Sequence, residues 1–579
     1  MARDDVIIRI GGEGGEGIIS SGDIITGASA KAGFHVYTFK TFPAEIRGGY
    51  AMYQLRASSK QILSQGDGFD VFVAFNNDAY QVNKKELKPG TVLLWDGPEG
   101  GDIQPESHPG VISYAVPMTR IAKDELKAPK AKNMVALGAI STLFSFPIET
   151  LKENIRLKFG KKGQEVVDIN IRAIDMGKEY VEKNIKKQDP YRLGEPQAKD
   201  KDVIVISGNE AVGLGALAAK VEFFSAYPIT PATEIAIMLA RNLPKLGGTL
   251  VQAEDEIASL GNVIGASYAG AKSMTATSGP GLSLMTELLG LASIAEIPLV
   301  VANVQRGGPS TGLPTKHEQS DLFTAVYGGH GDMSRIVLAV DNVEDCFHLT
   351  VDAFNLAEKY QIPVILLSDG SLGFRTEGIK VPDPSTLKLI DRKWFEPKGG
   401  EEVYKRYEYT KDLVSPMSKP GQPGGNYVAT GLEHGEVSRP VYTPENHTRM
   451  IDKRFGKLAN IEDEYKPTER EGDENADLGI ISWGSTQGAV REALARARAD
   501  GLKVAALYPK LIFPLPEKAI AKFAKSVKKV LIPEINKQAQ FAELVRARTG
   551  IDSIRYNIYG GLPFPPGDIY NKIKEVIRP

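Results

Sequence analysis

The sequence predicts an α/β protein made of several open, mostly parallel β-sheets. Short apolar runs rich in β-branched residues alternate with segments of helical spacing along most of the chain. Glycine or proline turns follow several of these runs, as in VIIRIGGEGGEG and FFSAYPITP. The chain has 579 residues, more than one ordinary hydrophobic core, so we expect about three or four domains.

The pattern divides the chain into four segments. Residues 1–190 predict strands at VIIRI, FHVYTF, VFVAF and TVLLWD and end in a polar linker. Residues 200–385 repeat the alternation with VIVIS, FFSAYPIT, SMTATS, IPLVVANV and IPVILLSD. Residues 386–475 are rich in Pro, Gly and charge, which predicts an extended excursion or docking segment. Residues 476–579 predict a further α/β domain with strands at LGIISWG, KVAALYP and KVLIPE.

Composition limits the function. A net charge of −2 gives no general attraction to nucleic acid or to an anionic membrane surface. Apolar runs such as IPLVVANV are shorter than the ~20 residues that span a bilayer. The one cysteine, Cys346, can form neither an internal disulfide nor a four-thiolate cluster site. We therefore expect a cytoplasmic protein, a buried Cys346, and any iron–sulfur cluster on another chain.

The glycine loop GGEGGEG follows the first predicted strand and precedes a helix. Backbone N–H groups in such a turn can bind a phosphate, and a tight structural turn is the alternative. The dinucleotide pattern also needs an acid at the end of the second strand, where this sequence has Lys40. We therefore discount NAD and FAD. Arg47, beside two glycines in AEIRGGY, is a second candidate phosphate contact.

A G-D-G motif occurs at residues 66–68 but does not predict a metal site. In thiamine enzymes a long spacer separates G-D-G from N-N, whereas here Asn76 follows after one strand. We reject Asp67 as a metal ligand, and no His/Cys cluster has metal spacing.

Several polar positions follow predicted strands in residues 227–320. In YPITP, Thr230 fits a helix N-cap, Pro231 the first helical position and Glu234 the first turn. Glu254, Asp255 and Glu256 precede an apolar helix, either as a solvated helix start or with Glu256 turned inward.

Two further turns extend this set. The Ser278-Gly279-Pro280-Gly281 turn would let a ligand approach the backbone. Arg306, after a buried strand, could grip a carboxylate, with a surface ion pair as the alternative.

These motifs resemble the alpha subunit of 2-oxoacid:ferredoxin oxidoreductases. The resemblance rests on YPITPATE, EDEIASLGNVIGASYAGAKSMTATSGPGLSLM, QRGGPSTGLPTKHEQSDL, GLEHGEVSRPVYTPENHTRMIDKRFGKL and ISWGSTQGAVREAL. The N-terminal GGEGGEG, FPAEIRGGY and KNMVALGA are similar to the gamma domain of the same enzymes, fused in front. The gamma-alpha fusion and the motif GLPTKHEQSDL look most like the 2-oxoglutarate branch of the family. The resemblance implies a thiamine-diphosphate pyrimidine-binding domain and a transketolase C-terminal-like domain.

The resemblance also implies the chemistry and the partners. Such enzymes use thiamine diphosphate, coenzyme A and ferredoxin to oxidise 2-oxoglutarate to succinyl-CoA and CO2, and in reverse they fix CO2, as in the reductive TCA cycle. Mg2+, the diphosphate-binding domain and a [4Fe–4S] cluster are expected on a separate beta subunit, in a dimer of alpha-beta heterodimers. Pyruvate or a branched-chain 2-oxoacid is the alternative substrate. A nicotinamide or flavin dehydrogenase and a noncatalytic coenzyme A-binding scaffold are the alternative classes.

Site residues follow from the matched motifs. Glu256, or Glu254 in another register, corresponds to the glutamate that bonds the pyrimidine ring and favours its imino tautomer. Arg306 corresponds to the arginine that holds the substrate's 1-carboxylate, and Thr230 to a threonine near the oxo group. The remaining expected residues are Tyr227, Pro228, Ile229, Ser278 and Gly279 for the cofactor; Thr315, Lys316 and His317 for the substrate; and Gly12, Gly14, Gly15, Gly17 and Arg47 for coenzyme A.

Overall fold

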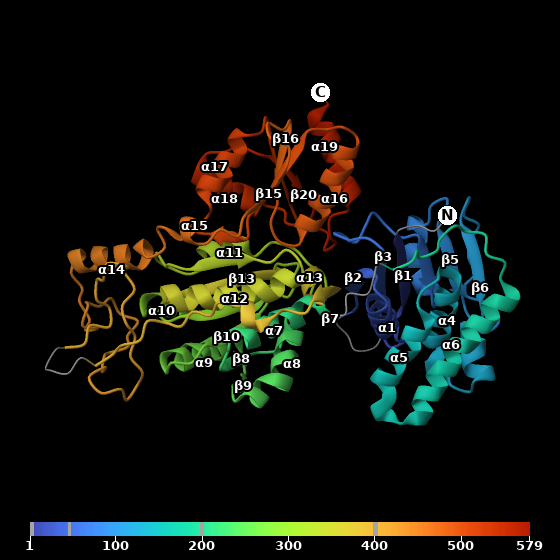
Figure 1. Ribbon diagram of the computed structural model, residues 1–579, viewed down its shortest axis with the longest axis horizontal. Coiled ribbons are helices and arrows are strands. Elements are labelled where there is room, and N and C mark those ends of the chain that lie inside the picture. The colour runs from blue at the N-terminus through green and yellow to red at the C-terminus, as the bar shows by residue number, and fades with distance from the viewer. Residues whose placement is uncertain (1–4, 44–47, 197–201, 398–402, 579) are drawn as a thin grey trace. The chain divides into compact units, whose positions relative to one another are not determined.

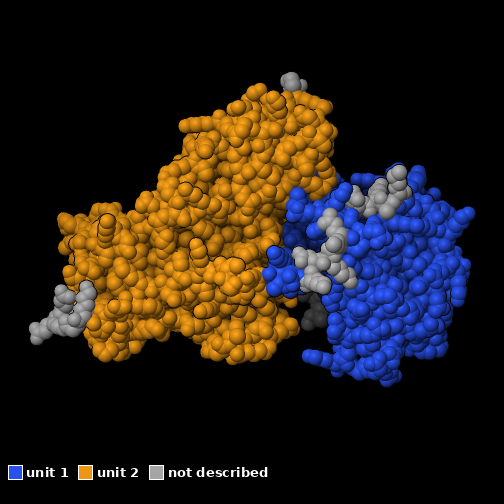
Figure 2. Space-filling model, viewed as in Figure 1, with its two compact units in different colours: residues 1–207, 374–381, 565–568 blue, residues 208–373, 382–564, 569–579 orange. Residues whose placement is uncertain are grey.

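The computed structural model describes residues 5–43, 48–196, 202–397 and 403–578. The chain forms two compact units, coloured separately in Figure 2. Unit 1 comprises residues 1–207, 374–381 and 565–568, and unit 2 comprises residues 208–373, 382–564 and 569–579.

Unit 1 contains a six-stranded sheet with the order β2-β3-β1-β4-β5-β6. The strands are β1 (Asp5–Glu13), β2 (His35–Thr41), β3 (Tyr50–Ser58), β4 (Val71–Ala74), β5 (Val92–Asp96) and β6 (Ile112–Val116). β1, β4, β5 and β6 are parallel, as expected, whereas β3 runs antiparallel to both of its neighbours. The sequence analysis does not predict β3 or β6.

Helices of unit 1 bury apolar side chains against this sheet in a main core cluster and in a smaller one that contains Ala79 and Tyr80. They are α1 (Ile18–Lys31), α2 (Asn77–Asn83), α3 (Met118–Arg120), α4 (Lys132–Phe144), α5 (Ile148–Phe159) and α6 (Gln164–Asn184), with short turns η1 (Lys84–Glu86), η2 (Ile121–Glu125), η3 (Pro129–Ala131) and η4 (Gly160–Lys162). The predicted strand VIVIS forms β7 (Val203–Ser207), which pairs with β14 (Thr376–Lys380) in a separate two-stranded sheet. The sequence pattern predicted that this strand would be the first of the next large sheet, and this prediction is wrong.

Unit 2 is organised around a seven-stranded sheet with the order β18-β12-β13-β11-β10-β8-β9 (Figure 1). Its strands are β8 (Phe223–Ala226), β9 (Thr249–Gln252), β10 (Ser273–Thr277), β11 (Leu299–Gln305), β12 (Ile336–Ala339), β13 (Pro363–Asp369) and β18 (Leu511–Phe513). All pairs are parallel except β12 with β18. The β11 strand is buried along its whole length, as an apolar run in a doubly covered parallel sheet requires.

The connections of this sheet are helical. They include α7 (Gly208–Ala218), α8 (Thr233–Asn242), η5 (Leu243–Leu246), α9 (Glu256–Tyr268), α10 (Gly279–Ile294), α11 (Leu322–Tyr327), α12 (Val343–Tyr360) and α13 (Gly370–Phe374). Cys346 lies on α12 and is buried, as predicted.

A five-stranded sheet completes unit 2, with the order β15-β17-β16-β19-β20. It consists of β15 (Glu469–Gly472), β16 (Leu478–Ile481), β17 (Val504–Tyr508), β19 (Val530–Glu534) and β20 (Ile554–Asn557), with helices α16 (Thr486–Ala499), α17 (Glu517–Lys525), α18 (Gln540–Thr549) and α19 (Pro566–Ile577). One core cluster contains side chains of both large sheets. The C-terminal part also supplies β18 to the seven-stranded sheet.

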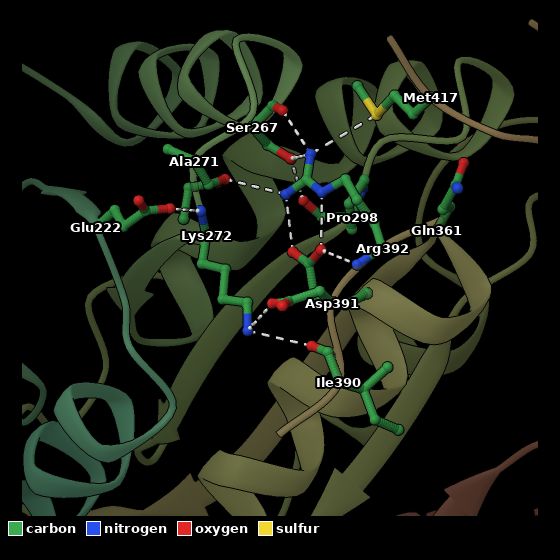
Figure 3. Close-up of polar contacts among 12 residues, drawn as sticks. Glu222, Ser267, Ala271, Lys272, Pro298, Gln361, Ile390, Asp391, Arg392 and Met417 are labelled. Carbon is green, nitrogen blue, oxygen red and sulfur yellow. Dashed lines mark hydrogen bonds and ion pairs between the residues drawn. The ribbon is translucent and has the colours of Figure 1, made fainter. Parts of the chain in front are cut away.

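The long segment between the two sheets of unit 2 has little regular structure. Its described elements are η6 (Pro384–Thr386), α14 (Pro444–Gly456) and α15 (Ile461–Glu464). Buried polar contacts help to hold it, and the side chains of Tyr407 and Met417 within it are also fully buried. Arg392 donates to both oxygens of Glu358 and to the carbonyls of Ser267 and Ala271 (Figure 3). Lys453 donates to both oxygens of Glu296.

Candidate active site

Four loops meet at one edge of the seven-stranded sheet. They leave the carboxyl ends of β8, β9, β10 and β11, which are adjacent and parallel. Ligands of open α/β sheets bind at this edge. The four motifs singled out from the sequence therefore lie on neighbouring strands, in the order β11, β10, β8 and β9.

Two carboxyl groups from other elements pack against two glycines of the Ser278–Gly281 turn. A Cβ atom at Gly281 would lie 2.7 Å from the Glu256 Oε1 atom, and one at Gly279 would lie 2.8 Å from the Asp321 Oδ1 atom. Side chains larger than hydrogen would displace both carboxyl groups. The glycines thus let two acids approach the start of α10 from opposite elements, α9 and the segment before α11.

Only one acid of the E-D-E triplet turns inward. Glu256 is 6% exposed, whereas Glu254 and Asp255 are exposed to solvent. Asp255 is the N-cap of α9, and its Oδ1 accepts a hydrogen bond from the Ala258 amide at 2.7 Å. The solvated helix start and the inward acid are therefore both present, on adjacent residues. This burial favours Glu256 over Glu254 as the residue that faces a ligand.

Arg306 directly follows β11 and is buried. Its Nη1 donates to the Thr230 carbonyl at 2.8 Å, while its Nε has no hydrogen-bond partner in the described part of the chain. It forms no ion pair within 4.0 Å among the described residues, although Asp321 and Glu256 both attract it electrostatically. Burial lowers the pKa of the guanidinium. The arginine is not a surface ion pair, and it retains donor capacity.

The YPITP turn differs from its predicted capping role. Helix α8 begins at Thr233 with Ala232 as its N-cap, so Thr230 and Pro231 precede the helix by more than the cap position. The turn is fixed through its carbonyls instead. Arg306 donates to the Thr230 carbonyl, and Asn209 Nδ2 donates to the Pro231 carbonyl at 2.7 Å. Sequence reasoning did not link these donors to the turn, because Arg306 follows β11 and Asn209 lies in α7, both distant from the turn in the chain.

Two cofactor candidates of this turn, Tyr227 and Pro228, are exposed, and Ile229 is half-buried. The Ser278 side chain is fully buried at the N-cap of α10, yet its hydroxyl has no partner among the described residues. Buried polar atoms are normally paired. An unpaired hydroxyl at a helix start beside Glu256 is therefore suited to a ligand group.

Asp321 is a site residue that the sequence analysis missed. Its Oδ2 accepts a hydrogen bond from Asn303 Nδ2 at 2.9 Å, and its backbone amide donates to Gln305 Oε1 at 3.0 Å. Burial raises its pKa to about 6. A signal was present, because Asp321, like Glu256, directly precedes an apolar helix.

The three predicted substrate residues after Arg306 differ in their burial and surroundings. His317 is 1% exposed, close to Gly370 and influenced by Asp369, and burial lowers its pKa. Lys316 is partly buried where it packs against Gly561, and burial lowers the pKa of its ammonium group. Thr315 lies half-buried in the preceding turn.

The N-terminal glycine loop has the predicted strand–turn–helix context in unit 1. Gly12 lies in β1, Gly14 pairs with Gly48 and Gly49 through backbone hydrogen bonds, Gly15 has a positive φ, and Gly17 is the N-cap of α1. Arg47 lies outside the described residues. Glu16 Oε2 accepts hydrogen bonds from the Glu13 amide at 2.8 Å and from Asn76 Nδ2 at 2.7 Å. The loop's own Glu16 carboxylate thus already accepts the hydrogen bond of one backbone amide in the loop.

Three further observations concern metal binding, Asp67 and membrane-spanning helices in the described residues. No group of three or more His, Cys, Asp or Glu side chains there could hold a metal ion. The Asp67 carboxylate accepts a hydrogen bond from the Gly567 amide within unit 1. No helix in the described ranges is both long enough and apolar enough to cross a membrane.

Comparison with known proteins identifies the class. Residues 214–453 match the family model described as pyruvate flavodoxin/ferredoxin oxidoreductase, thiamine diphosphate-binding. Residues 7–180 match pyruvate ferredoxin/flavodoxin oxidoreductase, and residues 476–562 match pyruvate:ferredoxin oxidoreductase core domain II. The chain is thus an oxidoreductase with the family's thiamine diphosphate-binding domain.

Two relatives, one of which aligns with almost the whole chain, show the family. The chain is 33% identical to 2-oxoglutarate oxidoreductase subunit KorA of Mycobacterium tuberculosis, over 99% of this chain and 92% of the relative. It is 40% identical to 2-oxoglutarate synthase subunit KorA of Methanothermobacter marburgensis, over 64% of this chain and 97% of the relative. The protein belongs to the 2-oxoacid:ferredoxin oxidoreductase family.

A solved structure matches the whole fold. It is the 2-oxoglutarate:ferredoxin oxidoreductase from Magnetococcus marinus, with 2-oxoglutarate, coenzyme A and succinyl-CoA bound. The TM-score is 0.95 with 57% sequence identity, and the match covers 100% of both chains.

Proposed function

We propose that this chain is the fused gamma-alpha subunit of a thiamine-dependent enzyme that oxidises 2-oxoglutarate with coenzyme A. The products would be succinyl-CoA, CO2 and reduced ferredoxin. The observation that carries this proposal is the buried Glu256–Ser278–Arg306 constellation at the carboxyl edge of the seven-stranded sheet. The end-to-end likeness to an enzyme solved with 2-oxoglutarate supports this substrate over pyruvate or a branched-chain oxoacid.

The residues around α10 fit the pyrimidine part of thiamine diphosphate. Glu256 is buried against Gly281, and its carboxylate can accept a hydrogen bond from a protonated ring nitrogen. The Ser278 hydroxyl, which has no partner among the described residues, offers a further hydrogen bond. Tyr227, Pro228 and Ile229 would supply one wall. Bound thiamine diphosphate supplies the nucleophilic carbon that attacks 2-oxoacids. The chain's own task is to hold the ring and keep the Glu256 carboxylate beside it.

Arg306 would bind the 1-carboxylate of the substrate. Its guanidinium is buried and anchored at one nitrogen by the Thr230 carbonyl, with Nε left without a partner among the described residues. A buried, pre-oriented guanidinium forms strong charge-assisted hydrogen bonds with a carboxylate. Thr230 would lie near the oxo group. Lys316 and Thr315 are candidates for the far carboxylate, and the burial of His317 makes it the less accessible candidate.

The missing half of the site would come from a beta subunit. Exposed apolar side chains occur on the elements that carry the site: Tyr227, Ile257, Leu284, Leu313 and Tyr327. Apolar groups at such positions are typical of a partner surface. The single cysteine is consistent with a [4Fe–4S] cluster, Mg2+ and the diphosphate-binding domain on that partner. Ferredoxin would take the electrons, in a dimer of alpha-beta heterodimers.

The gamma domain would contribute to coenzyme A binding through Gly12, Gly14, Gly15, Gly17 and Arg47. A phosphate at the Glu13 amide would have to displace Glu16, so Gly14, Gly15 and Gly17 are the better candidates. We retain the division into 1–190, 200–385, 386–475 and 476–579 as functional segments. The family-model matches at 7–180, 214–453 and 476–562 support it.

Co-expression with the beta subunit tests the function directly. The purified complex should reduce a redox dye with 2-oxoglutarate and coenzyme A, and should prefer 2-oxoglutarate to pyruvate and branched-chain 2-oxoacids. If the complex turned over only pyruvate, pyruvate would replace 2-oxoglutarate as the proposed substrate. Full turnover by variants of Glu256 and Arg306 would indicate a noncatalytic scaffold.

A further inference from the structure

Asp321 is held in one position by neighbours that do not neutralise it. Asn303 donates to its carboxyl group, and its backbone amide is fixed by Gln305. Its carboxyl group covers Gly279, the first residue of α10. Both anchoring residues belong to β11, so the carboxyl group is fixed to the strand that directly precedes Arg306.

The segment that carries Asp321 is also clamped from the C-terminal part of unit 2. Gln319 donates from its amide nitrogen to the Ile535 carbonyl at 2.7 Å and from Nε2 to the Trp483 carbonyl at 2.8 Å. Gln540 donates to the Ser320 carbonyl and accepts from the Phe323 amide. These bonds flank Asp321 on both sides, so the carboxyl group cannot easily move away from the site.

Arg306 and two carboxyl groups, those of Glu256 and Glu318, make up the charged surroundings of Asp321. Arg306 comes from the end of β11 and attracts both Asp321 and Glu256, the latter from α9. Glu318 comes from the same segment as Asp321 and repels it. Helix α10 contributes its N-terminus. With Asp321 ionised, one buried arginine is therefore shared between two buried carboxylates.

We infer that Asp321 is a positioning residue that takes up a proton when the carboxylate of a 2-oxoacid binds at Arg306. This inference rests on the proposed function. A substrate carboxylate beside Arg306 brings another negative charge close to Asp321, and like charges favour protonation of the more weakly stabilised acid. The protonated acid no longer competes for Arg306, and its O–H becomes a donor.

The sign of the pH dependence follows from the burial of the free carboxyl group. Desolvation raises the pKa of Asp321 to about 6 in the free protein, and substrate raises it further. Below the free value Asp321 is already protonated, so the KM for the oxoacid is constant. Above it each binding event must take up a proton, so KM rises by up to about tenfold per pH unit until the bound value is reached.

The test uses the complete enzyme with its beta subunit between about pH 6 and 9. For the wild type, the KM for 2-oxoglutarate and the inhibition constant of glutarate, the dicarboxylate without an oxo group, should rise roughly 5–10-fold. Asp321→Asn should remove this rise and give a lower KM than the wild type at the alkaline end. A purely structural role would raise KM at every pH.

Calorimetry with glutarate measures the proton directly. The heat of binding in two buffers of different ionisation enthalpy should show proton uptake by the wild type near neutral pH and none by Asp321→Asn. Glu318→Gln is the matched control, because it removes a nearby carboxyl group but should keep the uptake. Buffer-independent heat in the wild type overturns the inference, even if the Asp321 variant fails to fold. If the wild type neither turns over 2-oxoglutarate nor binds glutarate, the proposed function fails instead.

Discussion

Two buried arginines of unit 2 show how structure and function use the same side chain differently. Arg392, in the long segment, donates to both oxygens of Glu358 and to two backbone carbonyls, as Figure 3 shows in part. Arg306, at the site, donates to one carbonyl and leaves a buried nitrogen unpaired among the described residues. A fully paired cation anchors the fold, whereas an incompletely paired one is prepared for a ligand.

The largest effect should come from the site acid. Glu256→Gln keeps the shape but removes the negative charge beside the pyrimidine ring, so kcat should fall about 10²–10⁴-fold while the unfolding midpoint is unchanged. Oxoacid-dependent dye reduction by the complete enzyme measures this. Glu254→Gln, on the exposed side of the helix start, is the control and should keep most activity. Full activity of Glu256→Gln would remove the residue from the mechanism.

Substitution of Arg392, the structural anchor, should lower the stability of the fold and leave the catalytic site intact. Arg392→Ala removes the guanidinium that pairs with the buried Glu358 and leaves it the backbone amide of residue 392, which should lower the free energy of unfolding by about 3–5 kcal/mol. Denaturant unfolding followed by circular dichroism measures it. Arg439→Ala, at an exposed arginine of the same segment, should change stability by less than about 0.5 kcal/mol. A similar loss in both variants would contradict the contrast.

Arg306→Ala should show the opposite balance. Losing a charge-assisted hydrogen bond to the substrate corresponds to about 1.5–3 kcal/mol, or a rise in KM of roughly 10–150-fold, with little loss of stability. The measurement is KM for 2-oxoglutarate together with a thermal melt. Unchanged KM would remove Arg306 from the carboxylate site, and strong destabilisation would make it an anchor like Arg392.

The last prediction concerns the pH dependence of stability at a second buried anchor. Burial lowers the pKa of Lys457, which lies beside Glu296, to about 8. The unfolded chain keeps the ordinary value of about 10.4, so between these values the folded state binds fewer protons. Stability should therefore rise by up to about 3 kcal/mol over this alkaline window. Lys457→Met should flatten the rise, and an unchanged slope would assign it to another group.

Much of the fold could be predicted because its signals are local. The apolar runs of β8, β10 and β11 are continuous in the chain, and each is followed by its own turn motif. Glu256 could be singled out because it precedes an apolar helix face. The Thr230 cap was wrong because the donors that fix the YPITP turn, Asn209 and Arg306, are distant in sequence. Strand β3 was missed because antiparallel pairing on both sides has no local signature.

The sequence by itself determined the alternation of strands and helices, the four turn motifs and their residue types. Hydrophobic periodicity and turn chemistry depend on a few consecutive residues, so they can be recognised from the sequence. Only the tertiary structure decided which polar groups remain unpaired and which acids share Arg306. The pairing of Gln319 with Trp483 and Ile535, and the placement of Asp321 over Gly279, join segments far apart in the chain. Burial and charge at the site come from such long-range contacts, because desolvation depends on everything packed around a group.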